Sequence, residues 1–195
     1  IGDETISVVL FIDAGLKRSQ QMFADPNKHA VRPTKSISVL YDYRDSWATL
    51  AVELANEVPI FKGLTETEKT TISNRSTSLF TLHAIYQATN ALLTDFNDDK
   101  VIDEGRSLAL SYWSRLGEVI PEWRSIIDRE ISAAHLRKHY VHSHGVVLQA
   151  LGEVGSNLVR TYPDNWSERL QRLTQVDWRR TNTKLWEGRA MHHGK

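Results

Sequence analysis

Residues 78–94, with the sequence SLFTLHAIYQATNALLT, decide the fold class of this chain. Their large apolar side chains recur at intervals of three and four residues, which places them on one face of an α-helix. These side chains belong to Leu79, Leu82, Ile85, Tyr86, Leu92 and Leu93. We therefore predict an amphipathic helix that buries this face in a hydrophobic core.

Similar patterns on both sides of this stretch predict further helices. The later ones cover residues 101–120, 122–140, 145–162 and 166–177. Residues 37–58 have helical spacing too, with a break expected at 42–45, and the capping box at 65–68 predicts another helical turn. We expect the core to include Leu108, Tyr112, Trp113, Leu148 and Leu151.

The beginning of the chain has a different pattern. Residues 5–12, TISVVLFI, are rich in β-branched side chains and predict a strand, and residues 16–23 predict a short helix. A lone strand is not stable, so we interpret the chain as a fragment whose sheet begins upstream. The predicted fold class is mainly α: an N-terminal strand-plus-helix remnant of an α/β portion, followed by a multi-helix domain.

Composition excludes several classes of function. The chain has 24 Lys and Arg and 24 Asp and Glu residues, so it has no overall basic field, and any contact with DNA must use a local patch. The absence of cysteine excludes disulfides and cysteine-ligated metals from this sequence and fits a reducing cytoplasm. The longest apolar run, residues 6–12, is far shorter than the ~20 residues of a membrane span, so we expect no membrane partner.

Four blocks of the sequence resemble one known family. They are LKRSQQMFADPNKHAVRPTKSISVLYDYRD (16–45), VPIFKGLTETEKTTISNRSTSLFTLHAIYQAT (58–89), HSHGVVLQALG (142–152) and DWRRTNTKLWEGRAM (177–191). Together they cover most of the chain and are similar to the DndB proteins of DNA phosphorothioation systems. The family's Asp-Gly-Gln-His-Arg motif is absent here, so chemistry that depends on this motif is not transferred to the chain.

The resemblance implies a cytoplasmic prokaryotic protein that accompanies the machinery replacing a DNA backbone oxygen with sulfur. It implies a ParB-like N-terminal portion, of which residues 1–60 would be the C-terminal part, and a helical domain over residues 61–195. This boundary is soft, and a single domain is the alternative. In the family, DndB is associated with transcriptional control of the modification operon, which makes promoter DNA the expected partner.

A basic stretch near the start of the chain is the first candidate phosphate-binding site. Cations around a helix end and a loop are an arrangement that can contact phosphate oxygens. The candidate residues are Lys17, Arg18, Lys28, Arg32 and Lys35. The alternative is a solvated charged face, which is common on protein surfaces.

A second candidate patch lies at residues 178–186, WRRTNTKLW. Arg179, Arg180 and Lys184 are candidates for phosphate contacts, and Trp178 and Trp186 are candidates for stacking on bases. In the alternative interpretation, the two indoles anchor the C-terminal segment to the helical core while the arginines lie in water or pair with acidic neighbours.

Histidines give the weakest chemical signal. His135 and His139 lie four residues apart on a predicted helix, the spacing of two metal ligands, but the zincin glutamate is missing between them. We expect these histidines to be exposed or hydrogen-bonded, and we expect no metal or other cofactor. No nucleophile elbow or phosphate-binding glycine loop occurs, so we predict no catalytic residues.

The leading hypothesis is a DNA-associated transcriptional regulator of a phosphorothioation operon. One alternative is a nucleotide-handling or nucleic-acid-processing ParB-like enzyme whose active residues lie upstream of this sequence. Another is a protein-interaction module for other Dnd proteins. A second copy of the chain, as a homo-oligomer, is a further expected partner.

Overall fold

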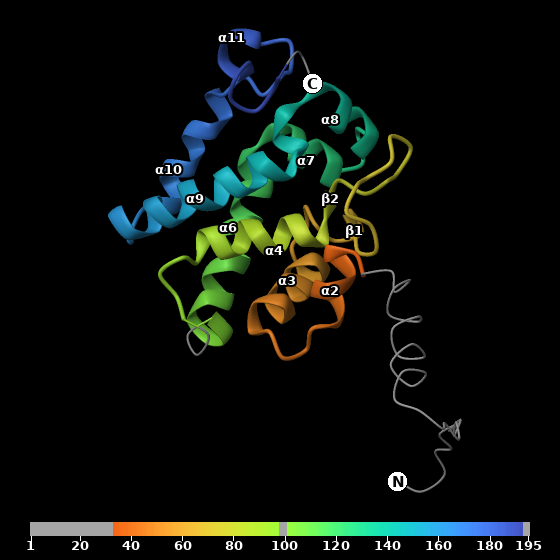
Figure 1. Cartoon of the computed structure of the whole chain (residues 1–195). Helices are drawn as coiled ribbons and strands as arrows, with labels where there is room; N and C mark the ends of the chain where they lie inside the picture. Colours follow the sequence, from red (N-terminus) through yellow and green to blue (C-terminus); the bar gives the residue numbers. More distant parts are fainter. Residues whose placement is uncertain (1–32, 98–100, 193–195) are drawn as a thin grey trace, which may run out of the picture. The chain divides into compact units, whose positions relative to one another are not determined.

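The computed structural model describes residues 33–97 and 101–192 (Figure 1). These residues are mainly α-helical with a single pair of very short strands among them, which confirms the predicted fold class. The strand predicted over residues 5–12 and the helix predicted over 16–23 lie outside the described residues.

The centre of the fold is a pair of helices, α4 (Leu82–Leu92) and α9 (Gly145–Thr161). The hydroxyl of Thr81 begins α4 by accepting a hydrogen bond from the amide of Ala84 at 3.1 Å. The two helices approach closely because α9 has a glycine at the contact: a Cβ on Gly152 would lie 2.2 Å from the carbonyl oxygen of Ala88. Figure 1 shows α9 running alongside α4.

Two helices precede this pair, α2 (Lys35–Tyr41) and α3 (Ser46–Glu57), and the break predicted between them at residues 42–45 is confirmed. Asp45 caps the start of α3, because its carboxylate accepts a hydrogen bond from the amide of Trp47 at 2.8 Å. Both helices pack against α4, with α3 burying Leu50 and Leu54.

The strands β1 (Thr65–Glu66) and β2 (Phe80–Thr81) pair in parallel, with Thr65 opposite Phe80. The helical turn predicted at residues 65–68 is therefore wrong. The hydroxyl of Thr65 donates to the carbonyl oxygen of Phe61 at 2.9 Å, so it does not cap a helix. A long loop leads from β1 back to β2.

After residue 100, a π-helical turn (Val101–Gly105) leads into α6 (Arg106–Val119), which buries Tyr112 and Trp113. The helix predicted over residues 122–140 is instead two helices, α7 (Pro121–Ile127) and α8 (Ala133–His139). Arg129 has a φ of 61°, a left-handed conformation that ends α7 and that non-glycine residues rarely adopt.

The C-terminal part is made of short pieces. A 3₁₀ turn (Val141–Ser143) precedes α9, and α10 (Trp166–Arg169), a second 3₁₀ helix (Leu170–Gln175) and α11 (Thr183–Trp186) follow it. None of the helices within the described ranges is long and apolar enough to cross a membrane.

The predicted core is confirmed. All eleven apolar residues named from the sequence are buried or partly buried and belong to one cluster. Because α3 and α4 pack together, helices from both sides of the expected boundary at residues 60 and 61 share this cluster. The division into residues 1–60 and 61–195 remains a prediction, since residues 1–32 lie outside the described part.

Candidate functional site

Backbone pairing brings two basic segments together. Tyr140 and Arg179 form an antiparallel bridge, and the amide of Arg180 donates to the carbonyl oxygen of His139 at 2.9 Å. The last turn of α8 is thereby joined to the second basic patch of the sequence. We call residues 137–139 and 178–184 the basic region; its cations are Arg137, Lys138, Arg179, Arg180 and Lys184.

Trp178, in the basic region, and Trp186, just after it, lie against the core. Trp178 is only 5% exposed, and its ring stacks on that of Trp186 with centroids 5.3 Å apart. The indole nitrogen of Trp186 donates to the carbonyl oxygen of Asp177 at 2.8 Å. This geometry favours the anchoring role for both indoles. Stacking of either ring on a base stays a prediction.

A buried histidine lies behind the tryptophans. His142 Nδ1 accepts a hydrogen bond from the indole nitrogen of Trp123 at 3.0 Å, so the ring proton of the neutral form is on Nε2. Nε2 lies 3.4 Å from Glu122 Oε2, which is long for a hydrogen bond. Burial lowers the pKa of His142. Burial alone would raise the pKa of Glu122, but His142, a backbone hydrogen bond and the charge of Arg179 together outweigh burial and lower this pKa.

The two histidines considered as weak metal candidates do lie together. The rings of His135 and His139 are 4.6 Å apart on the exposed side of α8. Within residues 33–97 and 101–192, no group of three or more metal-ligating side chains occurs. Two imidazoles alone do not complete a tetrahedral zinc site, so we assign no metal to them.

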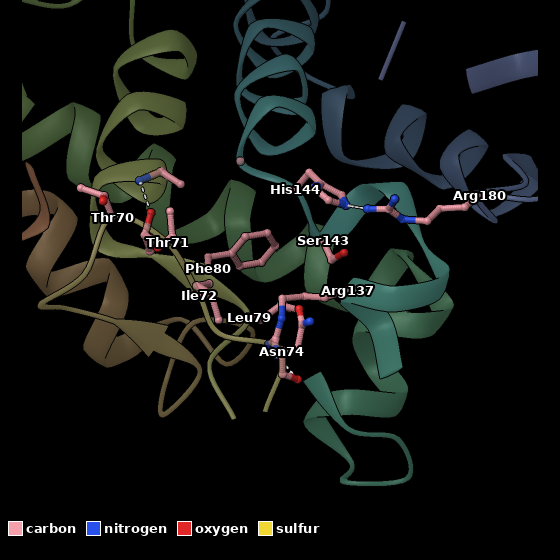
Figure 2. Close-up of a pocket in the computed structure, with 13 residues that line it drawn as sticks. Thr70, Thr71, Ile72, Asn74, Leu79, Phe80, Arg137, Ser143, His144 and Arg180 are labelled. Carbon is pink, nitrogen blue, oxygen red and sulfur yellow. Dashed lines mark hydrogen bonds between the residues drawn. The ribbon is translucent and has the colours of Figure 1, made fainter. Parts of the chain in front are cut away.

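A pocket of about 430 Å³ lies at the edge of the basic region, which contributes Arg137 and Arg180 to its lining (Figure 2). The loop from β1 to β2 forms one side, and the start of α9 forms the other. The lining residues are Thr70, Thr71, Ile72, Asn74, Leu79, Phe80, Thr81, Ala84, Arg137, Ser143, His144, Gly145 and Arg180. The pocket thus combines hydroxyl groups with two guanidinium groups.

Arg137 holds the loop that forms one side of the pocket. Its guanidinium donates hydrogen bonds to four carbonyl oxygens, those of Ser73 (3.0 Å), Asn74 (3.3 Å), Ser76 (2.9 Å) and Ser78. Burial lowers the pKa of Arg137 from its usual value. Carbonyl dipoles satisfy its donors, but they do not cancel its charge.

Arg180 contacts a neutral partner instead of an acidic one. Its guanidinium donates to His144 Nε2, and Figure 2 shows the two side chains end to end at the edge of the pocket. Burial, and then the charge of Arg180, lowers the pKa of His144 to about 4, so His144 is uncharged at neutral pH. In the described part of the chain, neither Arg137 nor Arg180 forms an ion pair with a carboxylate.

The structure separates the remaining predicted residues. Arg179 and Lys184 are exposed in the basic region, and their contact with phosphates stays a prediction. Lys35 lies on α2 and lines a different pocket with His83 and Tyr86. Lys17, Arg18, Lys28 and Arg32 lie outside the described residues.

Sequence reasoning did not select Arg137 as part of a site. The sequence feature that could have indicated Arg137 is the run of basic residues in the last turn of α8. Cations at this end of a helix also interact favourably with the helix dipole. The sequence could not show that this turn meets residues 178–180.

Comparison with known proteins identifies the family. A family model described as DndB, DNA-sulfur modification-associated, matches residues 1–195, the whole chain. No curated protein and no solved structure matches it. The family links the chain to the DNA sulfur modification system. Because the match extends over the entire sequence, the chain belongs to the DndB family of DNA-sulfur-modification-associated proteins.

Proposed function

We propose that the chain is a DNA-associated regulator of a phosphorothioation operon, and that its basic region contacts promoter DNA. The observation that supports this most is the joining of two basic segments through the bridge between Tyr140 and Arg179. A chain with no net charge thereby gains a local concentration of cations. Such a patch can position a protein on the phosphate backbone.

The exposed members of the basic region are available for this contact. Lys138, Arg179 and Lys184 are exposed, and none of them forms an ion pair with a carboxylate of the described residues. Each cation that neutralises a phosphate of duplex DNA releases counterions and contributes about 0.9 to the salt slope of binding. Three such contacts would give a slope of about −3 in log K against log salt.

The test is a salt series of equilibrium binding between the 195-residue chain and DNA from upstream of its own operon. Scrambled DNA of the same length is the competitor. We expect preferential binding to the upstream DNA. In the double variant Arg179→Gln with Lys184→Gln, the magnitude of the salt slope should decrease by about 2. Arg172→Gln is the matched control, because Arg172 is exposed and outside the basic region.

Equal binding to both DNAs, or equal slopes for the double variant and Arg172→Gln, would contradict the proposal. In that case the two alternatives make different predictions. A ParB-like enzyme predicts nucleotide turnover by a longer form of the protein, whereas an interaction module predicts a stable complex with other Dnd proteins without DNA.

A further inference from the structure

The pocket beside the basic region has positive charge that nothing in the described residues balances. Arg137 and Arg180 both line it, and their hydrogen-bond acceptors are carbonyl oxygens and a neutral imidazole. Partly buried charges without a partner are costly, and binding an anion removes this cost. Two guanidinium charges in one pocket match a dianion better than a monoanion.

Two further features add to the positive potential on the Arg180 side of the pocket. Arg180 Nε is buried and has no hydrogen-bond partner among the described residues. The 17-residue helix α9 begins at the pocket with Gly145, so the positive end of its dipole adds to the guanidinium charge. Gly145 is exposed and lines the pocket.

The shape of the pocket indicates that the ligand has more than a phosphate group. A volume of about 430 Å³ is within the range of sites for small organic molecules. Apolar residues such as Ile72 and Ala84 line the pocket together with the hydroxyls of Thr70 and Thr71. These apolar lining residues suit a small apolar or heterocyclic body.

We infer that this pocket binds a small phosphate monoester, with its phosphate on Arg180 and the start of α9 and its organic body against Ile72 and Ala84. A DNA phosphodiester is the poorer match, because it has one charge for two guanidinium groups. The pocket uses Arg137 and Arg180 of the basic region, whereas the contacts proposed for DNA use the exposed Lys138, Arg179 and Lys184.

The loop that forms the pocket wall is held in place without a ligand. Arg137 binds four carbonyl oxygens within residues 73–78, and the hydroxyl of Ser36 donates to the carbonyl oxygen of Lys69 at 3.0 Å. The ligand therefore does not have to order this loop, which lowers the entropic cost of binding.

Calorimetric titration of the 195-residue chain at low salt tests the inference, with phenyl phosphate, inorganic phosphate and benzyl alcohol as probes. We expect saturable binding of phenyl phosphate, weaker binding of inorganic phosphate and no binding of benzyl alcohol. Arg180→Gln should weaken phenyl phosphate binding at least about tenfold, as expected for a charge-assisted pair of about 1.5–3 kcal/mol. The affinity of Arg180→Lys for phenyl phosphate should lie between those of the natural chain and Arg180→Gln. Arg172→Gln should bind phenyl phosphate as tightly as the natural chain does.

A measurement on the natural chain keeps the test decisive if Arg180→Gln does not fold. Phenyl phosphate, but not benzyl alcohol, should slow amide hydrogen exchange at residues 70–74 and 143–147. The inference is overturned by the absence of saturable binding, by equal effects of Arg180→Gln and Arg172→Gln, or by unchanged exchange at these residues. Loss of DNA preference with phosphate binding intact would refute only the proposed function.

Discussion

Substitution of Gly152 by alanine tests the close contact between α4 and α9. The new Cβ would lie 2.2 Å from the carbonyl oxygen of Ala88 and 3.3 Å from the amide nitrogen of Leu92. Both atoms belong to the backbone, so the helices themselves must move. Overpacking costs ~1–3 kcal/mol, and we take the upper end because no side chain can rotate away. Alanine also favours a helix over glycine by ~1 kcal/mol, which leaves a net loss of about 2 kcal/mol.

The matched control is Gly117→Ala in α6. There the new Cβ would lie 3.4 Å from Ile127 Cδ1, an ordinary contact with a side chain. We therefore expect Gly117→Ala to be neutral or to stabilise the chain by up to ~1 kcal/mol. Thermal unfolding of both variants is the assay, and for a chain of 195 residues the loss for Gly152→Ala corresponds to ~4–8 °C. Equal or reversed shifts would refute the argument that the helix contact requires glycine.

Three further changes have defined outcomes. Tyr112→Phe removes the hydroxyl that donates to the carbonyl oxygen of Leu151 at 2.5 Å, and should lower the free energy of unfolding in urea by about 1 kcal/mol. Arg137→Ala should speed limited proteolysis within residues 73–78 several-fold, because four carbonyl oxygens lose their donor. The free energy of unfolding should fall as the pH decreases from 6.5 toward 4, because only the unfolded chain protonates His144 in that range, and His144→Gln should reduce this fall.

Each of these expectations has a result that would contradict it. An unchanged urea midpoint for Tyr112→Phe would mean that the hydroxyl contributes nothing to stability. Proteolysis of Arg137→Ala at the rate of Arg137→Lys would mean that the guanidinium fork does not hold the loop. A pH dependence unaffected by His144→Gln would mean that the pKa of His144 is the same in the folded and unfolded chain.

The helices could be predicted where one face is continuously apolar. Residues 78–94 do form a helix, but it begins at Leu82, because Phe80 and Thr81 pair with β1. Local spacing does not show such pairing, since the partner strand lies in another part of the chain. The break at Arg129 was missed for a related reason: a left-handed conformation at arginine has no signature of the kind that glycine gives.

The site was predictable only in part. The second basic patch was found from its composition, and the structure places Arg179 and Lys184 at the surface. The pocket itself could not be found from composition, because Arg137, His144 and Arg180 come from three segments that no spacing rule connects. Whether Trp178 anchors the segment or stacks on a base depends on its burial, and the sequence WRRTNTKLW does not reveal that burial.

The contacts of Arg137 also have a consequence for how the chain is made. This residue holds carbonyl oxygens that lie 59–64 positions earlier, and Arg180 meets His144 across 36 positions. Contacts of such long range form late, because the loop at residues 73–78 is synthesised well before Arg137, the residue that binds it. A chain that ends before residue 137 would lack the hydrogen bonds of Arg137 to the loop at residues 73–78. A chain that ends before residue 180 would lack Arg180 in the lining of the pocket. The ligand binding inferred above would therefore require a chain that extends at least to residue 180.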